Sequence, residues 1–402
     1  MKKIFFLCVL ILSILLILPF SSCRKKNEIA EGGIDFSSLK FECETELSFA
    51  SQFKIEKSGG FTLLSVSGGE KFLLVPPPEK ENPAAFDSLK NASVKNVPSD
   101  VTVLRLPIEN AYLVSTSAMD FIEKIGAIGS IGFSGTKKKD WRIKGAVDAM
   151  EDGRILYAGK YSAPDYELLL SRGCQLAIEN TMIFHKPEVK EKLLEIGIPV
   201  IIERSVYEKN PLGRLEWIKF YGCLFGKEKE AAEFFDSEIQ KIKPVLEQNV
   251  SENTSGTEKN KMSVAFFYVN ANGIVNVRKP GDYISTLIAL SGGRYALDSV
   301  VPEEENSLST MNMQFEDFYT NALDADIIIY NGDIAGEIAT LDELLSLNPL
   351  FADFKAVREG RMYCTGKDFF QESTCIASFL KELSDIQSGD ESSLLYLRKI
   401  TR

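Results

Sequence analysis

The sequence has a single histidine, His185, among its 402 residues. A bare zinc ion is commonly held by several histidines, so a site of that kind is excluded. A serine hydrolase would need His185 as its base, and no Gly-x-Ser-x-Gly segment is present to carry the serine. The chain also lacks a Gly-x-x-x-x-Gly-Lys-Ser/Thr segment, so it does not power transport through a P-loop. These absences argue against an enzyme.

Cysteines are too few and too scattered to form a disulfide framework. They are found at positions 8, 23, 43, 174, 223, 364 and 375, with no Cys-x-x-Cys pair. Loss of Cys8 with a signal peptide and modification of Cys23 would leave an odd number. Cys364 and Cys375 are expected to be two buried thiols, although a bond between them stays open.

Positive charge and long apolar runs are also scarce. The net charge is −11, and −13 once residues 1–22 are removed. An acidic surface repels the phosphate backbone, so we expect no nucleic-acid partner. After residue 22 no apolar run is long enough to cross a membrane. A small anionic ligand held by a few local cations is compatible with this charge.

The first 23 residues have the layout of a secretion signal. A short basic start precedes an apolar run over 4–20, and two serines lead into Cys23. A transmembrane anchor is the alternative, because the run is just long enough to span a bilayer. The stretch resembles a bacterial lipobox, in which the cysteine is acylated, although Phe20 replaces the usual leucine. We therefore expect an extracytoplasmic protein anchored to the membrane by a lipid on Cys23.

The hydrophobic pattern changes along the chain. Alternation around two Gly-Gly breaks over 45–76 indicates short antiparallel strands. From a strand at 102–107 onward, apolar runs separated by helical patterns predict an α/β fold of two lobes with mainly parallel sheets, one long helix between them and a ligand cleft. The predicted segments are a signal peptide (1–22), a lipid-anchored tether (23–44), a small β-rich segment (45–95), an N-terminal α/β lobe (96–225), an interlobe helix (226–249), a polar linker (250–261) and a C-terminal α/β lobe (262–402).

Polar and aromatic residues follow the predicted strands of both lobes. Ligands of open α/β folds bind outside the carboxyl ends of the strands, so these residues are candidates for the cleft. They are Glu179, Asn180, Thr181, Met182 and His185; Glu203, Arg204, Ser205 and Tyr207; Asn270, Asn272 and Arg278; Thr365, Lys367, Phe369 and Gln371. This mixture of cations, amides and aromatics suits a large polar chelate.

Four segments, in this order, resemble the metal-chelate substrate-binding proteins of ABC importers, the class with a rigid interlobe helix that binds ferric siderophores, haem or cobalamin. The segments are PDYELLLSRGCQLAI (164–178), LLEIGIPVIIERSVYEKNPLGRLEWIKFYGCLFGKEKEA (193–231), VRKPGDYISTLIALSGGRYAL (277–297) and MQFEDFYTNALDADIIIYNG (313–332). The resemblance implies a monomer with no intrinsic cofactor that captures an iron chelate or haem. Cobalamin is the alternative ligand, and a ligand-free scaffold or adhesin lipoprotein is the alternative function.

The resemblance also implies a partner. In this class each lobe presents one exposed glutamate to arginines of the membrane permease, which works with ATPase subunits. By position these are Glu167 and Glu316, with Asp317 as a near rival. Each precedes a predicted buried strand on a short helix. Plain solvated acids on helix surfaces are the alternative interpretation.

The expected ligand contacts are Arg204, His185, Tyr207, Met182, Arg278 and Gln371. An arginine offers a fork of donors that suits planar carboxylate or catecholate groups. For Arg204 the alternative is an ion pair with Glu203 or Glu208. His185 is a candidate haem ligand, with Met182 as a second one; otherwise it lines the cleft or caps the next helix.

Helical spacing accounts for a further group of residues. Trp217 and Tyr221 lie four positions apart, which favours packing in the core. Arg214 is expected to form an ion pair that braces the helix between the lobes.

Overall fold

A computed structural model describes residues 34–43, 46–77, 94–254, 261–301, 309–366 and 369–401. The predicted signal peptide, its lipidation residue Cys23 and most of the predicted tether lie outside these ranges. The chain divides into two compact units. The smaller unit, over 1–38 and 78–97, contains the parallel pair β1 (Ile34–Asp35) and β5 (Val94–Lys95), and the short helix η1 (Phe36–Ser38). All that follows concerns the larger unit, over 39–77 and 98–402.

The larger unit begins with a sheet of four strands in the order β2–β3–β4–β6. Its strands are β2 (Phe53–Ser58), β3 (Phe61–Val66), β4 (Glu70–Val75) and β6 (Val101–Arg105). The first three are antiparallel, as their alternation predicts, whereas β6 pairs parallel to β4. The strand expected to open the N-terminal lobe therefore belongs to this sheet. We call these strands, with residues 46–52, the N-terminal β-module.

The N-terminal lobe is built on a parallel sheet in the order β13–β12–β7–β8–β9. Its strands are β7 (Ala111–Leu113), β8 (Ile131–Ser134), β9 (Leu156–Tyr157), β12 (Leu176–Glu179) and β13 (Val200–Ile202). Its helices are α3 (Thr116–Lys124), η2 (Ile128–Ser130), η3 (Lys138–Asp140), α4 (Lys144–Glu151), α5 (Tyr166–Ser171), η4 (Thr181–His185), α6 (Pro187–Glu195) and η5 (Ser205–Tyr207). A small antiparallel pair, β10 (Gly159–Lys160) and β11 (Ala163–Pro164), precedes α5. The inner strand β12 is buried on every residue because neighbours cover both faces.

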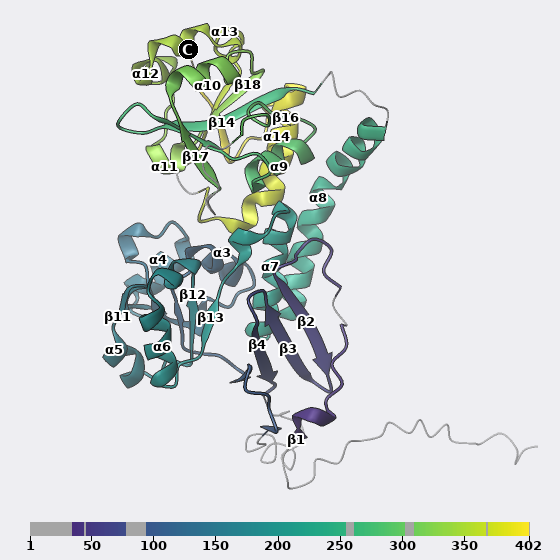
Figure 1. Ribbon diagram of the computed structural model, residues 1–402, viewed down its shortest axis with the longest axis vertical. Coiled ribbons are helices and arrows are strands. Elements are labelled where there is room, and N and C mark those ends of the chain that lie inside the picture. The colour runs from purple at the N-terminus through teal and green to yellow at the C-terminus, as the bar shows by residue number, and fades with distance from the viewer. Residues whose placement is uncertain are drawn as a thin grey trace, which may run out of the picture. The chain divides into compact units, whose positions relative to one another are not determined.

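Two consecutive helices follow the N-terminal lobe. Helix α7 (Pro211–Leu224) starts with a proline, and the side chain of Asn210 caps it by accepting a hydrogen bond of 2.9 Å from the amide of Leu212. Helix α8 (Glu228–Thr254) packs against α7 and against α9 and α14 of the next lobe (Figure 1). It extends beyond the predicted end at 249, so the first residues assigned to the polar linker are helical.

The C-terminal lobe has a mixed sheet in the order β17–β15–β14–β18–β19–β20, with β16 beside β14. Its centre, β14–β18–β19, is parallel, and the outer strands are antiparallel. The strands are β14 (Ser263–Val269), β15 (Val275–Arg278), β16 (Arg294–Tyr295), β17 (Thr310–Met313), β18 (Ile327–Tyr330), β19 (Met362–Thr365) and β20 (Leu397–Lys399). The helices are α9 (Tyr283–Leu290), α10 (Phe315–Ala322), α11 (Gly332–Ala335), α12 (Leu341–Leu347), η7 (Pro349–Asp353), α13 (Lys355–Glu359), η8 (Ser373–Cys375) and α14 (Ile376–Ser388).

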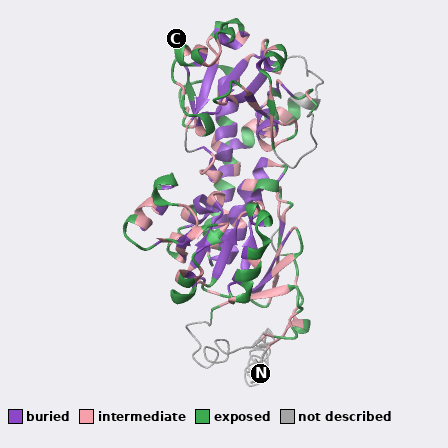
Figure 2. Ribbon diagram, turned by 60° about the vertical axis from the view of Figure 1, so that its left-hand side comes forward, coloured by how far each residue is buried: buried purple, intermediate pink, exposed green. Residues whose placement is uncertain are grey.

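Buried residues follow the strands of both lobes and helix α7 (Figure 2). Trp217 and Tyr221 are fully buried on α7, in agreement with their expected place in the core. Cys364 and Cys375 are free, buried thiols. Within the described ranges no helix combines the length and apolar character that a membrane span requires.

Candidate functional site

A pocket of about 570 Å³ lies between residues of the two lobes, a volume in the range of small-molecule sites. The N-terminal side contributes residues 206–209 and Arg214 of α7, and the C-terminal side contributes the ends of β14, β15 and β18 with the start of α9. Its lining includes the aromatic residues Tyr207, Tyr268, Tyr283 and Phe370, and the basic residues Lys209, Arg214, Arg278 and Lys279.

Arg278, at the end of β15, is one of the predicted ligand residues and lines this pocket. Its Nη1 atom lies 3.3 Å from Oδ2 of Asp282 and 3.3 Å from Oγ of Ser309. The guanidinium also lies over the rings of Tyr283 and Phe370, at 5.1 and 5.0 Å from their centroids. Burial raises the pKa of Asp282, although the charge of Arg278 acts in the opposite direction.

Arg214 lies over the same tyrosine from the other lobe. Its Cζ atom is 4.0 Å from the ring centroid of Tyr283. The expected ion pair of Arg214 is not found among the described residues, although the charge of Arg214 acts to lower the pKa of Asp282. Two guanidinium groups thus share one ring, and in the part of the chain that the structure describes Asp282 forms an ion pair with Arg278 alone. The pocket therefore offers at least one arginine whose hydrogen-bond donors are available to an anionic ligand.

Residues 204–208, which we call the wall segment, run along the N-terminal side of the pocket and contribute residues 206–208 to its lining. Val206 and Tyr207 line it, and both side chains are exposed. Arg204 lies over the rings of Phe184 and Tyr207, at 5.4 and 5.9 Å from their centroids, but does not line the pocket itself. Neither Glu203 nor Glu208 pairs with Arg204, so the alternative interpretation of Arg204 as an ion-pair partner is not supported.

Both acids next to Arg204 are engaged elsewhere. Glu203 accepts hydrogen bonds from the amide of Ser205 at 2.7 Å and from the hydroxyls of Ser115 and Ser117 at 3.2 Å. Glu208 is bound to the N-terminal β-module and to Trp217. The charge of Arg204 is therefore not neutralised by its sequence neighbours.

His185 and Met182 lie in η4, directly after β12, and both are exposed. They are not part of the pocket lining. Helix α6 is capped at Lys186 without a side-chain hydrogen bond, so the alternative role of His185 as a helix cap is wrong. Its neighbour Phe184 reaches Arg204, which connects η4 to the wall segment. The role of His185 as a haem ligand stays a prediction.

Gln371 connects the lobes. Its Oε1 accepts a hydrogen bond of 2.8 Å from the amide of Arg142, and its Nε2 donates one of 2.9 Å to the carbonyl of Asp140. Both groups of the amide are thus occupied by the N-terminal lobe, and Gln371 does not line the pocket. Each group of the amide keeps one further hydrogen-bonding position, so the contact of Gln371 with a ligand stays a prediction.

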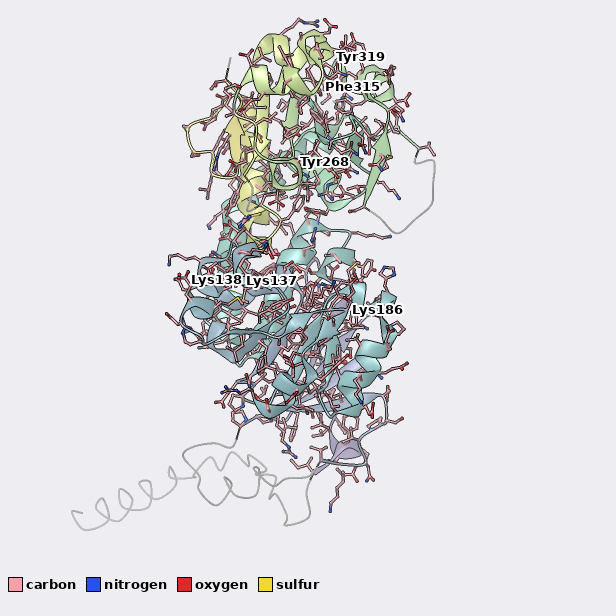
Figure 3. All side chains as sticks on the ribbon, turned by 90° about the vertical axis from the view of Figure 1, so that its left-hand side faces the viewer. Lys137, Lys138, Lys186, Tyr268, Phe315 and Tyr319 are labelled. Atoms are coloured by element: carbon pink, nitrogen blue, oxygen red, sulfur yellow. The ribbon has the colours of Figure 1, made fainter. Side chains whose placement is uncertain are left out.

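Further basic residues lie on the N-terminal lobe. Lys137, Lys138 and Lys139 follow β8 and are exposed, as is Lys186 before α6. Lys138 pairs with Glu151 at 3.1 Å, and Lys186 pairs with Glu188. Figure 3 shows Lys137, Lys138 and Lys186 on the side of this lobe that faces the C-terminal lobe. Tyr268 belongs to the C-terminal lobe.

The two candidate docking acids occupy matching positions. Glu167 lies in the first turn of α5, before β12, and Glu316 lies in the first turn of α10, before β18. Both are exposed, as is Asp317. Both strands lie inside their sheets, β12 between β13 and β7, and β18 between β14 and β19. The equivalence of the two helices agrees with the sequence; their contact with a permease stays a prediction.

Glu179, at the end of β12, has both carboxylate oxygens buried without a hydrogen-bond donor among the described residues. Burial raises the pKa of this carboxyl to about 8. It lies near Tyr112 and Tyr166 rather than on the pocket. Glu179 therefore lies in the core of the lobe, and its expected place in the cleft is wrong.

Several pocket residues escaped the sequence prediction. Tyr283 starts α9 because Asp282 caps the helix, accepting hydrogen bonds of 2.9 and 3.0 Å from the amides of Ile284 and Ser285. The Asp-Tyr pair at a helix start was a usable signal. The sequence contained no signal for Arg214 as a pocket residue, because only the packing of α7 against α9 places it over Tyr283.

Comparison of sequences finds relatives with few assigned properties. No family model matches the chain. An uncharacterised lipoprotein of Methanocaldococcus jannaschii, MJ0872, is 24% identical over 426 aligned residues that cover 100% of both chains. A second lipoprotein of that organism, MJ0878, is 24% identical and covers 75% of this chain and 68% of its own.

Comparison of structures identifies the fold. A periplasmic binding protein from Veillonella parvula matches with a TM-score of 0.55 and 15% identity, covering 85% of this chain and 99% of its own. The periplasmic haem-binding protein HutB of Vibrio cholerae matches with 0.54 and 15%, covering 70% and 98%. A protein of the Fe³⁺-hydroxamate transport system from Saccharomonospora viridis matches with 0.50 and 16%, covering 70% and 94%. The chain therefore has the two-lobed fold of the periplasmic substrate-binding proteins of ABC importers, as the four sequence segments predicted.

Proposed function

We propose that this protein is an extracytoplasmic lipoprotein that captures an anionic iron chelate, a siderophore or haem, and delivers it to an ABC permease. The observation that carries the proposal is the pocket between the lobes, in which Arg214 and Arg278 lie over one tyrosine ring beside further aromatic side chains. The solved neighbours named above include a haem-binding protein and a component of ferric hydroxamate transport.

The side chains favour a chelate over a bare metal ion. No group of three or more histidine, cysteine, aspartate or glutamate side chains that could hold an ion exists among the described residues. A metal would therefore arrive with its own ligands, and the protein would recognise those ligands. Arginine forks suit carboxylate, catecholate or hydroxamate oxygens, and aromatic rings suit a flat or apolar remainder of the ligand.

Haem and siderophores would use different parts of this site. A tetrapyrrole would extend over Phe184 and Tyr207 toward His185 and Met182, the exposed residues after β12. A compact anionic siderophore would need only the arginines and the aromatic rings of the pocket. Cobalamin lacks a net anionic rim and would make less use of Arg214.

Lipid anchoring and docking complete the proposal. Cys23 would hold the protein at the membrane surface, as the names of the Methanocaldococcus relatives suggest for those proteins. Glu167 and Glu316 would contact the permease, one from each lobe, while the ATPase subunits supply the energy.

A ligand titration tests the function. The chain from Arg24 onward is titrated with haemin, cyanocobalamin, and ferric complexes of a catecholate and a hydroxamate siderophore, and tryptophan fluorescence and visible absorption are recorded. We expect one tight one-to-one complex, with an iron chelate. Cobalamin binding alone would revise the ligand, and the absence of binding to every probe would favour a ligand-free scaffold. With haemin, His185→Ala should abolish the absorption shift if His185 is the axial ligand.

A further inference from the structure

The N-terminal β-module contacts the first residue of the wall segment. The turn between β3 and β4 contains Gly68, at φ +106°. A Cβ atom on Gly68 would collide with Nη2 of Arg204 and lie 2.9 Å from its Cζ atom. The guanidinium thus lies against the backbone of this turn, on the side of Phe184 and Tyr207. Glycine suits the positive φ at position 68, and a side chain there would displace the end of Arg204.

Glu70, two residues after Gly68, fixes the turn to the lobe. Glu70, at the start of β4, forms an ion pair with Lys190 of α6. Its other carboxylate oxygen lies 3.4 Å from the amide of Ile202, the last residue of β13. The wall segment begins two residues later, at the carboxyl end of that strand. The hairpin therefore reaches the edge of the sheet that leads into the pocket.

The β-module also holds the last residue of the wall segment. Glu208 is 3% exposed, and its carboxylate accepts hydrogen bonds from the amide and hydroxyl of Ser51 and from the amide of Gln52, all between 2.9 and 3.0 Å. Trp217 donates a further bond of 3.0 Å through Nε1. Four donors thus fix Glu208, which follows Tyr207 directly. Hydrogen bonds to a charged acceptor are stronger than neutral ones.

A second glutamate binds the same loop at a distance from the pocket. Glu216 is fully buried on α7 and accepts hydrogen bonds from the amides of Ser48, Phe49 and Ala50 at 2.8 to 3.0 Å. Lys219 donates a fourth bond of 2.7 Å. Glu216 therefore matches Glu208 in burial, charge and number of donors, but it is not adjacent to the wall segment and does not line the pocket.

We infer that the N-terminal β-module is a positioning element of the ligand site, which holds the wall segment at both of its ends. Between these ends the backbone makes only a single short turn, with bonds from Tyr207 N to Arg204 O at 2.9 Å and from Glu208 N to Ser205 O at 3.1 Å. Val206 and Tyr207 are exposed on this turn, and the ring of Tyr207 lies against Arg204, the residue that the hairpin turn touches. The module thus decides where the aromatic wall of the pocket lies. This inference rests on the proposed function for its effect on ligand affinity.

Three variants of the full chain, kept in detergent micelles, test the inference. Glu208→Gln removes the charge that fixes the wall segment, Ser51→Ala removes one donor from the module side, and Glu216→Gln is the matched control. The probe is whichever of haemin, ferric catecholate or ferric hydroxamate binds the unaltered chain. We expect Glu208→Gln to weaken binding about tenfold, through faster dissociation. Ser51→Ala should weaken it in the same direction and less, although Ser51 cannot touch the ligand. Glu216→Gln should leave affinity within about twofold while lowering stability.

Hydrogen exchange tests, without a ligand, whether the N-terminal β-module positions the wall segment. The amides of Tyr207 and Glu208 should exchange faster in Glu208→Gln and Ser51→Ala, and at an unchanged rate in Glu216→Gln. If exchange follows this pattern but no probe binds the unaltered chain, the proposed function fails and the positioning role stands. If Glu208→Gln and Glu216→Gln give equal exchange at these amides, the positioning role is refuted, whatever the affinities.

Discussion

The carboxylate of Asp120, on α3 of the N-terminal lobe, accepts two hydrogen bonds of 2.7 Å from Thr374 of the C-terminal lobe, one from its amide and one from its hydroxyl. Both residues are buried. Burial raises the pKa of Asp120, although the two bonds from Thr374 act in the opposite direction. Gln371, three residues earlier, adds its bonds to Asp140 and Arg142. The lobes are thus joined by polar contacts as well as by α8.

These contacts predict little lobe closure on ligand binding. Small-angle scattering profiles of the free and the ligand-bound chain should nearly coincide. Thr374→Val removes the hydroxyl donor, should lower the free energy of unfolding by about 1 kcal/mol, and should allow a larger difference between the two profiles. A large compaction of the unaltered chain would refute the rigid arrangement.

Arg214→Ala should weaken the binding of an anionic chelate about 10- to 100-fold, because it removes a charged donor that lies over a tyrosine ring and lines the pocket. Titration of the variant with the chelate that binds the unaltered chain measures the loss. Arg154, which pairs with Asp152 on the exposed surface, provides the control Arg154→Ala. Equal affinities of the two variants would remove Arg214 from the site.

Glu179→Gln should stabilise the protein at neutral pH. The folded chain keeps the Glu179 proton up to its pKa of about 8, whereas the unfolded chain releases it near the ordinary glutamate pKa of roughly 4.3. Stability therefore falls as the pH rises through this window. The gain from the substitution should be near zero at about pH 4 and should reach about 3 kcal/mol at pH 7.

Urea denaturation between these pH values measures the difference in the free energy of unfolding. The exposed residue Glu191 gives the control, since Glu191→Gln should not change the pH dependence. A gain that does not depend on pH would show that Glu179 is ionised in the folded state.

Gly213→Ala should destabilise the protein by about 1–3 kcal/mol, although alanine usually favours a helix over glycine. A Cβ atom there would lie 2.8 Å from the carbonyl oxygen of Phe49 and 3.1 Å from Cα of Ala50. Gly129→Ala is the control, because no atom lies within 4 Å of its added Cβ. Thermal or urea denaturation compares the two, and a more stable Gly213→Ala would contradict the close approach of this loop to α7.

Glu167→Ala and Glu316→Ala should lower ligand uptake in cells and leave ligand affinity unchanged, because both acids are exposed and distant from the pocket lining. The double variant should be more severely impaired than either single one. Glu359→Ala, an exposed acid on α13, is the control for a general effect of charge. Normal uptake by the double variant would reject the docking role.

The sequence predicted those elements that depend on local pattern. The wholly buried β12 and β18, the helices α5 and α10 before them, and the long α8 follow from apolar runs, caps and helical spacing. It assigned 102–107 to the wrong sheet, because the parallel pairing of β6 with β4 joins segments separated by a region without pattern. The hydrophobic pattern of a strand predicts that it is a strand, but it does not identify a pairing partner far away in the sequence.

The candidate site was predicted less completely than the fold. Tyr207 and Arg278 line the pocket, as expected from their positions after buried strands. Arg214 was expected to brace the helix between the lobes, but it lines the pocket. Gln371 was expected at the ligand, but its hydrogen bonds connect the lobes. Both positions depend on how the lobes pack on each other, and no spacing along the chain encodes that packing.

Glu208 and Glu216, which bind residues 48–52, tie the evolution of the N-terminal β-module to that of α7 and the residues before it. A descendant that lost the module would leave Glu208 and Glu216 without the backbone donors that now satisfy them, which is destabilising wherever the carboxylates stay shielded from water. The two acids and the loop must therefore be gained or lost together. A glutamate at each of these two positions, eight residues apart, should mark those relatives that carry the module, even where the module's own sequence has diverged.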